Sequence, residues 1–131
     1  MILLDTQAAA WLVTRPQRLS SVAAGVIRRH RLRNGLAIAS ASLMELASML
    51  AAGEIRPKGT PQEWLRAFVA ETGVVVRDLT VDIAAVAAYL PPSFPGDPFD
   101  RLIAATAIVE RVSLVTSDTH IQRSRVVHTI W

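Results

Sequence analysis

Short apolar runs alternate with longer stretches of helical periodicity along this sequence. The apolar runs contain three to five residues, a length typical of buried strands. The predicted strands are Ile2–Leu4, Leu36–Ala39, Val74–Val76, Ser113–Thr116 and Val126–Ile130. The predicted helices are Thr6–Val13, Val22–Leu32, Ser42–Ala52, a helix from the cap-like Thr60 to Gly73, Thr80–Leu90 and Pro98–Glu110.

The order of these elements predicts the fold class. Strands separated by helices indicate right-handed crossover connections, which build a buried parallel sheet with helices on both faces. We therefore expect an α/β protein with a three-layer α/β/α architecture and a central parallel sheet. No repeat or linker divides the sequence, so residues 1–131 are expected to form a single domain. In such folds ligands bind beyond the carboxyl ends of the strands.

Composition narrows the class of protein. With 51% hydrophobic residues, the 131-residue chain is too apolar for intrinsic disorder. The absence of cysteine excludes a disulfide scaffold, a zinc ribbon and a thiol nucleophile. The run Met1–Leu4 is too short for a signal peptide, and Leu36–Ala52 is interrupted by Glu45 and three serines. We expect a cytoplasmic protein with no membrane contact.

Four acids follow predicted strands or lie in the helices beside them. Asp5 directly follows Ile2–Leu4, and Asp118 follows the strand that ends at Thr116. Asp100 lies one turn into a helix, and Glu45 lies in the first turns of the helix after the second strand. Because the carboxyl ends of parallel strands meet at one edge, we expect these four carboxylates to converge on one rim.

Each acid also has a purely structural interpretation. Asp5 can cap the first helix, Asp118 can be a turn residue, and Glu45 can lie on a solvated helix face. Asp97, which precedes a proline, has the pattern of a helix cap, with Asp100 as its partner in the first turn. Singly, most of these structural interpretations are favoured. Jointly they are weaker, because independent caps and turns have no reason to gather on one rim.

A rim of carboxylates predicts a bound cation. Like charges a few ångströms apart raise each other's pKa, so the cluster stays ionised only beside a positive charge. Oxygen ligands without cysteine or a histidine pair favour Mg²⁺, with Mn²⁺ as the other possibility, over zinc. Such an ion takes further ligands from substrate phosphates and can activate water. The predicted chemistry is phosphodiester hydrolysis with one metal ion or two.

Four segments, taken in order, resemble the PIN domain, and in particular the VapC-type toxins of bacterial toxin–antitoxin pairs. The segments are Ile2–Thr6, Ser40–Ala47, Asp97–Ala107 and Leu114–Asp118, and the ending Val127–Trp131 is also typical of these toxins. The likeness covers nearly the whole chain, and the order of the segments makes it specific. It implies a Mg²⁺-dependent endoribonuclease that cleaves structured RNA such as tRNA or rRNA.

The same resemblance implies roles for individual residues. The catalytic and metal-binding quartet is Asp5, Glu45, Asp100 and Asp118. Within it, Asp5 and Asp100 are implied as direct metal ligands, and the other two as acids that place metal or water. Asp97 is implied as an accessory acid and Thr116 as a polar supporting residue. The resemblance further implies a cognate VapB-like antitoxin that inserts a segment into the groove, and a homodimer.

The densest basic run ends the second predicted helix and has two interpretations. It contains Arg28, Arg29, Arg31 and Arg33. Cations at a helix C-terminus complement the helix dipole, which is the favoured structural interpretation. The functional interpretation is contact with the RNA backbone or with the antitoxin. The net charge of +3 is compatible with a polyanionic partner.

Three other functions remain as alternatives. A haloacid-dehalogenase-like phosphatase also places an Asp after its first strand, but it needs a second Asp where Gln7 stands. This glutamine also departs from the His or Ser frequent in VapC-type toxins, although it is not a quartet position. A receiver domain needs an acidic pair that is missing after the first strand. A catalytically silent PIN-like module that binds RNA or protein would be favoured by depleted acids, and all four are present.

Overall fold

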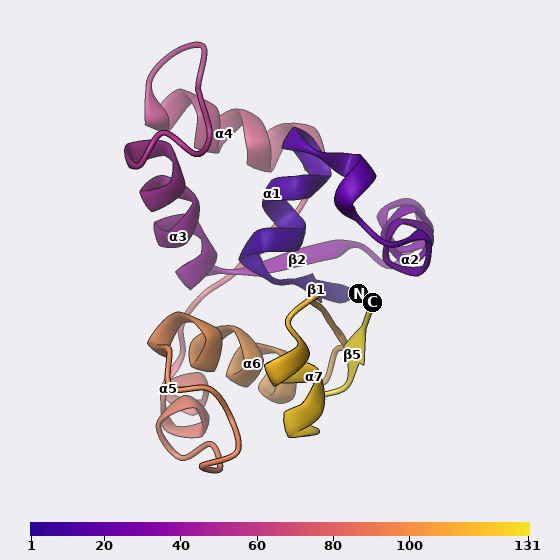
Figure 1. The fold of residues 1–131 in the computed structure, drawn as a ribbon, viewed down its shortest axis with the longest axis vertical. Helices are drawn as coiled ribbons and strands as arrows, with labels where there is room; N and C mark the ends of the chain where they lie inside the picture. Colours follow the sequence, from indigo (N-terminus) through magenta and orange to yellow (C-terminus); the bar gives the residue numbers. More distant parts are fainter.

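A computed structural model describes residues 1–131 and has a five-stranded parallel sheet at its centre (Figure 1). The strands are β1 (Ile2–Leu4), β2 (Leu36–Ala39), β3 (Val75–Arg77), β4 (Leu114–Val115) and β5 (Thr129–Ile130). Their order in the sheet is β3-β2-β1-β4-β5, and every neighbouring pair is parallel. The strand order reverses between β1 and β4, which is where open α/β sheets form a crevice.

Seven α-helices and one 3-10 turn cover the two faces of the sheet. They are α1 (Thr6–Thr14), η1 (Pro16–Arg18), α2 (Ser21–Leu32), α3 (Ser40–Ala51), α4 (Pro61–Thr72), α5 (Val81–Ala88), α6 (Pro98–Glu110) and α7 (Thr119–Ser124). In Figure 1, α1 to α4 lie above the sheet and α5 to α7 lie below it. No helix is both long and apolar enough to span a membrane.

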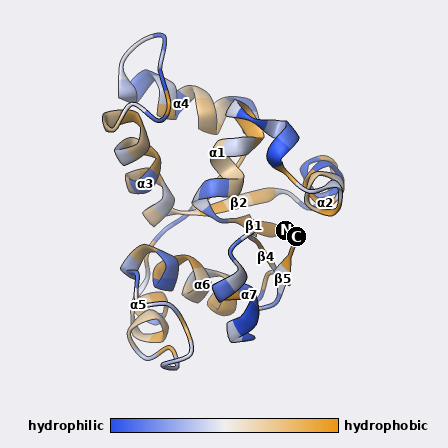
Figure 2. Cartoon of the chain, in the orientation of Figure 1, coloured by the Kyte–Doolittle hydropathy of each residue, from blue (hydrophilic) through white to orange (hydrophobic).

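Adjacent strand residues point to opposite faces and so build two cores. Leu4 and Ile38 belong to the larger cluster, which they form with side chains of α1 to α4. Leu3 and Ala37 belong to the second cluster, which contains side chains of α6 and α7. The strands accordingly form an apolar layer between the two sets of helices in Figure 2. This arrangement confirms the three-layer architecture expected from the alternation of strands and helices.

Local signals set the helix boundaries. Ser20 caps α2 by accepting a 3.0 Å hydrogen bond from the Ala23 N–H. Thr60 and Glu63 form a reciprocal capping box at the start of α4, as the sequence predicts. The same helix ends at Gly73, whose φ of 70° lies in the left-handed region that glycine adopts without a Cβ penalty.

Several elements differ from the sequence prediction. The helix expected at Ser42 begins at Ser40, because β2 passes directly into α3 without a connecting loop. The helix expected to reach Leu90 ends at Ala88. The sequence pattern predicts neither η1 nor α7, because three and six residues are too few to display helical periodicity. α7 begins where Asp118 accepts hydrogen bonds from two backbone N–H groups of its first turn.

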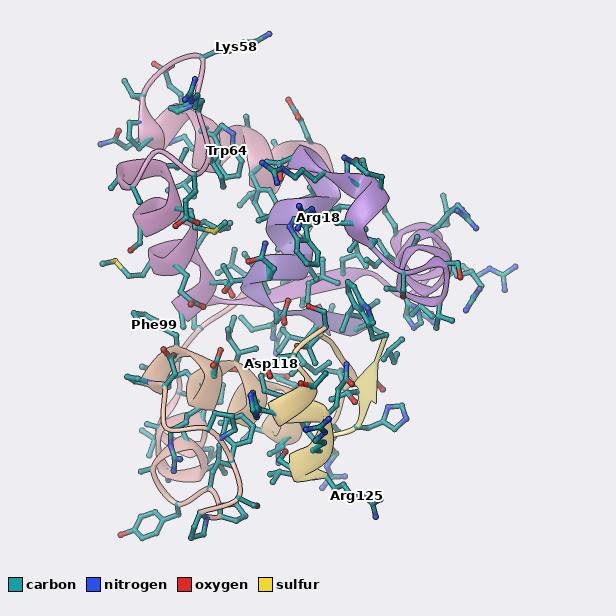
Figure 3. All side chains as sticks on the ribbon, in the orientation of Figure 1. Arg18, Lys58, Trp64, Phe99, Asp118 and Arg125 are labelled. Atoms are coloured by element: carbon teal, nitrogen blue, oxygen red, sulfur yellow. The ribbon has the colours of Figure 1, made fainter.

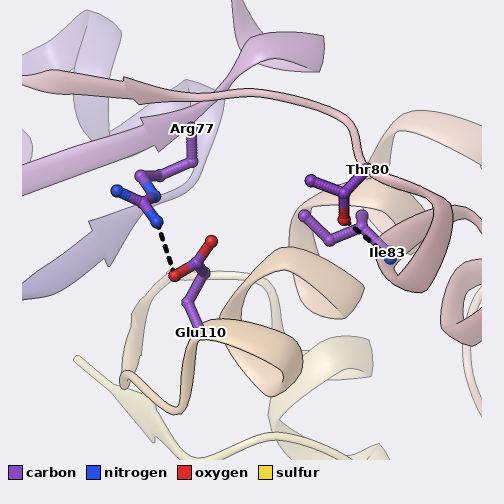
Figure 4. Close-up of polar contacts among 4 residues, drawn as sticks. All are labelled: Arg77, Thr80, Ile83 and Glu110. Carbon is purple, nitrogen blue, oxygen red and sulfur yellow. Dashed lines mark hydrogen bonds and ion pairs between the residues drawn. The ribbon is translucent and has the colours of Figure 1, made fainter.

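Two arginines fix the lower helical layer. Arg101 donates to the carbonyl oxygens of Ala87 at 3.0 Å, Ala88 at 3.4 Å, Leu90 at 3.3 Å and Pro95 at 3.5 Å. It thereby satisfies carbonyl groups left free where α5 ends. Arg77, at the end of β3, forms an ion pair with Glu110 at 2.7 Å (Figure 4). That figure also shows the Thr80 hydroxyl capping the start of α5.

The Arg101 contacts predict a stability effect. Replacing Arg101 by Met keeps the aliphatic stem but leaves carbonyl groups of the α5–α6 connection without a donor. We expect the free energy of unfolding to fall by about 1–3 kcal/mol in urea denaturation. The matched control is Arg66→Met, which changes an exposed arginine of α4 and should shift stability by less than about 0.5 kcal/mol. Equal losses in the two variants would contradict this role of Arg101.

Candidate functional site

A pocket of about 650 Å³ lies at the carboxyl ends of the strands, where α1, α6 and α7 begin, and extends along α3 to the residues that follow it. The structure brings all four acids of the predicted quartet into its lining: Asp5, Glu45, Asp100 and Asp118. The other lining residues are Thr6, Gln7, Ser48, Met49, Ala52, Glu54, Phe99 and Ser117. Figure 3 places Phe99 and Asp118 at the level where the upper and lower helical layers meet.

Asp5 is the most buried carboxylate of the pocket. It follows β1, caps α1 by accepting a 2.7 Å hydrogen bond from the Ala8 N–H, and is only 8% exposed. Burial raises the pKa of Asp5 from 3.8 to about 6, against the lowering effect of hydrogen bonds with Thr116 and Ala8. The charges of Asp118 and Glu45 add to the increase in pKa. The structure therefore confirms that Asp5 caps α1. In this position its carboxylate also lines the pocket together with the other acids.

Thr116 links Asp5 to Asp118. Its side chain is fully buried, forms a hydrogen bond with Asp5, and accepts a 3.1 Å bond from the Asp118 N–H. Asp118 in turn caps α7 by accepting bonds from the N–H groups of His120 at 2.8 Å and Ile121 at 3.3 Å. The buried Thr116 side chain thus helps to fix the positions of two pocket acids.

Glu45 is held by the first residue of α1. The Thr6 hydroxyl donates to Glu45 Oε1 at 2.5 Å, and Thr6 Oγ1 lies 2.9 Å from the buried Ser42 Oγ. Burial raises the pKa of Glu45, the bond from Thr6 lowers it, and the charge of Asp97 raises it. Glu45 therefore faces the pocket rather than lying on a solvated helix face.

Asp97 and Asp100 have separate positions at the start of α6. Asp97 is exposed and caps this helix through bonds from the N–H groups of Phe99 at 2.8 Å and Asp100 at 3.0 Å. It does not line the pocket. Asp100 does, and its pKa is raised from 3.8 to about 7 by burial and then by the charges of Asp97, Glu45 and the two other quartet acids.

The pocket contains a fifth carboxylate that the sequence analysis missed. Glu54 follows α3 and lines the same hollow. It follows no predicted strand and begins no helix, so no local pattern distinguishes it from an ordinary surface acid. Thr6 and Gln7 also line the pocket because they follow Asp5 at the start of α1.

The donor chemistry of the pocket fits a hard divalent cation. Five carboxylates line it without any Lys, Arg or His side chain, so no basic side chain in the pocket balances their charge. The raised pKa values of Asp5 and Asp100 follow from that burial and crowding. The acids line one pocket and raise one another's pKa, but in this structure no group of three Asp, Glu or His side chains forms a ready-made metal site.

The basic run lies elsewhere. Arg29 and Arg31 are in the last turn of α2, which precedes the start of β2. They therefore lie near the amino ends of the strands, whereas the pocket lies at the carboxyl ends. Arg31 also donates to the Glu71 carbonyl oxygen at 2.5 Å. These positions agree with the structural interpretation of cations at a helix C-terminus. Contact of Arg28, Arg29, Arg31 and Arg33 with RNA stays a prediction.

Comparisons with known proteins match this fold throughout. The sequence model of the PIN domain matches residues 2–126. Ribonuclease VapC22 of Mycobacterium tuberculosis (strain ATCC 25618 / H37Rv) is 39% identical over 124 residues, which cover 95% of this chain and 92% of the relative. The structure of VapBC2 from Rickettsia felis, bound to a DNA fragment from its promoter, aligns with a TM-score of 0.73 and 20% identity, covering 98% of this chain and 97% of that one. VapBC-1 from nontypeable Haemophilus influenzae aligns with a TM-score of 0.68 and 19% identity, covering 98% and 96%.

The buried acids predict that the metal-free protein loses stability as the pH rises. Because the folded-state pKa of Asp5 is about 6 and the unfolded value is 3.8, the folded protein binds the extra proton between these values. The contribution of Asp5 is complete below pH 4 and is lost by about pH 7, at a cost of roughly 3 kcal/mol. Asp100 acts in the same direction. Urea denaturation at several pH values in the presence of a chelator measures the loss.

Asp5→Asn provides the control for this prediction. Asparagine retains the ability to cap α1 but carries no charge, so the fall in stability between pH 4 and pH 7 should flatten. At pH 8 the variant should then be more stable than the wild type without metal, and added Mg²⁺ or Mn²⁺ should stabilise the wild type more than the variant. If stability falls more steeply with pH in the variant than in the wild type, folding lowers the pKa of Asp5 and the prediction is wrong.

Proposed function

The chain belongs to the PIN domain family, and from this premise we propose that it is a Mg²⁺-dependent endoribonuclease, the toxin of a VapBC-type toxin–antitoxin system. The observation that carries the proposal is the pocket with five carboxylates and no basic side chain, at the point where the strand order reverses. The 39% identity to a protein named as a ribonuclease supports the reaction class. The substrate is proposed to be structured RNA such as tRNA or rRNA.

The quartet would hold the metal. Asp5 and Asp100, whose carboxylates combine burial with mutual repulsion, are proposed as direct ligands. Glu45 and Asp118 would orient a further ligand or the attacking water from the two sides of the pocket. When bound, Mg²⁺ would lower the pKa of water and neutralise charge on the phosphate. Mn²⁺ has the same preference for oxygen ligands and is expected to substitute.

Two hydroxyl groups prepare the acids for this task. Thr6 donates to Glu45, and Thr116 bonds to Asp5. A hydrogen bond to a carboxylate favours its charged form, so both threonines oppose the effect of burial and keep the acids available as ligands. They also restrict side-chain rotation, which fixes the direction of the free carboxylate oxygens. Asp97 acts from outside the pocket, through its charge and through the start of α6.

The proposed reaction is hydrolysis of one phosphodiester bond. The oxygen of water forms a bond to phosphorus while the bond between phosphorus and O3′ breaks. The departing O3′ takes up a proton, which leaves a 3′-hydroxyl on one fragment and a 5′-phosphate on the other.

The proposed partner is a VapB-like antitoxin. The solved structures that share this fold include VapBC assemblies from Rickettsia felis and Haemophilus influenzae, which supports a protein inhibitor of the same kind here. We expect the antitoxin to cover the pocket and the toxin to form a homodimer in the cytoplasm. If a small open reading frame lies directly upstream of the gene, co-expression with it, followed by size-exclusion chromatography with light scattering, measures both assemblies.

The central prediction concerns RNA cleavage. The wild type should cut RNA with Mg²⁺ and lose this activity with a chelator. Asp5→Asn and Asp100→Asn should each lower the cleavage rate by more than about 100-fold, because each removes a proposed ligand. Thr116→Val, which keeps the shape of the buried side chain, should cost roughly 10- to 100-fold, the range typical of groups that orient metal ligands. Gel analysis of labelled RNA gives the rates.

The matched control is Asp82→Asn, which removes an exposed acid from the first turn of α5, outside the pocket. Its cleavage rate should equal that of the wild type. If the wild type and both ligand variants cut equally well, the pocket is not the active site. If the folded wild type, free of antitoxin, cuts no RNA with either metal, the protein is a silent binding module.

A further inference from the structure

The acidic pocket continues into two smaller hollows along α1. The first, of about 250 Å³, shares Gln7, Met49 and Glu54 with the pocket. The second, of about 430 Å³, shares Thr14 with the first. Together we call these two hollows the α1 groove. It extends from the acidic pocket to the loop between α3 and α4, which lies at the top of Figure 1.

The charge changes along the α1 groove. Glu54 lies at the junction with the pocket, Arg15 lies in the first hollow, and Arg56 and Lys58 lie in the second. None of these cations forms an ion pair, since the ion pair of this structure joins two other residues. Two acids, Glu63 and Glu71, also line the second hollow, and the carboxylate of Glu63 is engaged in the capping box of α4.

Aromatic side chains accompany the cations. Trp11 lines the first hollow, and the Arg18 guanidinium lies 5.8 Å from the centre of its ring. Trp64 lines the second and stacks on Phe68 with ring centres 5.6 Å apart and an interplanar angle of 7°. Figure 3 shows Lys58 and Trp64 in the same upper region, remote from Asp118. Cations interleaved with aromatic faces are the pattern by which proteins bind single-stranded nucleic acid.

We propose that the α1 groove binds the RNA strand on one side of the cleaved bond. The scissile phosphate lies in the acidic pocket, the adjoining nucleotides cross Gln7 and Arg15, and more distant phosphates contact Arg56 and Lys58. Trp11 and Trp64 offer apolar surface to the bases along this path. The inference rests on the proposed ribonuclease function, because that function places a phosphodiester in the pocket. The inference adds the path that the bound RNA strand follows from the pocket along the α1 groove.

Electrostatics favours RNA as the occupant at the far end of the groove. A phosphate backbone is attracted to Arg56 and Lys58 and is repelled by the pocket acids until a divalent cation offsets them. Binding of a long strand therefore depends on contacts outside the pocket, and short RNA gains nothing from them. The contribution of the groove should consequently depend on RNA length and on salt concentration.

The test measures RNA binding without cleavage. In the Asp100→Asn background, fluorescence anisotropy with Mg²⁺ compares a 12-nucleotide and a 4-nucleotide labelled oligouridine over a range of KCl concentrations. Adding Arg56→Gln and Lys58→Gln should weaken binding of the 12-mer by roughly 5- to 10-fold. It should also reduce the magnitude of the slope of log affinity against log KCl concentration by about 1.4, the value for two phosphate contacts with a single strand. Binding of the 4-mer should be unchanged.

Arg66→Gln is the matched control, because Arg66 is an exposed arginine of α4 that does not line the groove. It should leave both affinities unchanged. Equal effects of the control and the groove variants, or no effect of the groove variants on the 12-mer, would overturn the inference. So would groove variants that retain RNA affinity but lose affinity for the cognate antitoxin, because the groove would then be a protein docking site. If the wild type cuts no RNA while the 12-mer still binds through Arg56 and Lys58, the proposed function fails and the groove remains an RNA site.

Discussion

The crowding of negative charge at one edge of the sheet is the constraint on which the site depends. Five carboxylates line one pocket, and no basic side chain lines it with them. Burial and mutual repulsion raise the pKa values of Asp5 and Asp100 to about 6 and about 7. An arrangement of this kind lowers the stability of the folded protein near neutral pH unless a cation binds. Charge that costs stability in this way is typical of functional sites.

Helix starts explain how the fold tolerates this charge. Asp5, Asp97 and Asp118 cap α1, α6 and α7, so each accepts backbone N–H groups that have no partner inside the helix. The positive ends of these helices lie beside the acids and partly offset their charge. The capping and the functional interpretations of these residues are therefore compatible. The parallel sheet makes them so, because its crossover helices begin where the strands end.

The protein surface is divided by the same topology. Helix starts and acids gather at the carboxyl ends of the strands, while the basic end of α2 lies at the opposite edge. The cations nearer to the acidic pocket are instead those of the α1 groove. They are Arg15, which follows α1, and Arg56 and Lys58, which lie in the loop after α3. A net charge of +3 therefore hides a separation of charge that composition alone does not describe. Attraction of a polyanion and binding of a cation can then occur at neighbouring places on one molecule.

The sequence by itself determined the class of fold, the five strands, the long helices and the quartet of acids, because apolar periodicity and caps are local properties of the chain. It did not reveal α7, which is too short to show a period, or Glu54, which follows no strand. Only the tertiary structure decided which residues form hydrogen bonds with the acids, since the bond between Thr6 and Glu45 joins positions 39 residues apart. It also added Glu54 to the acids that the sequence placed on one rim, and it showed that the basic run lies away from them. These outcomes depend on how the sheet pairs its strands, and no local pattern contains that pairing.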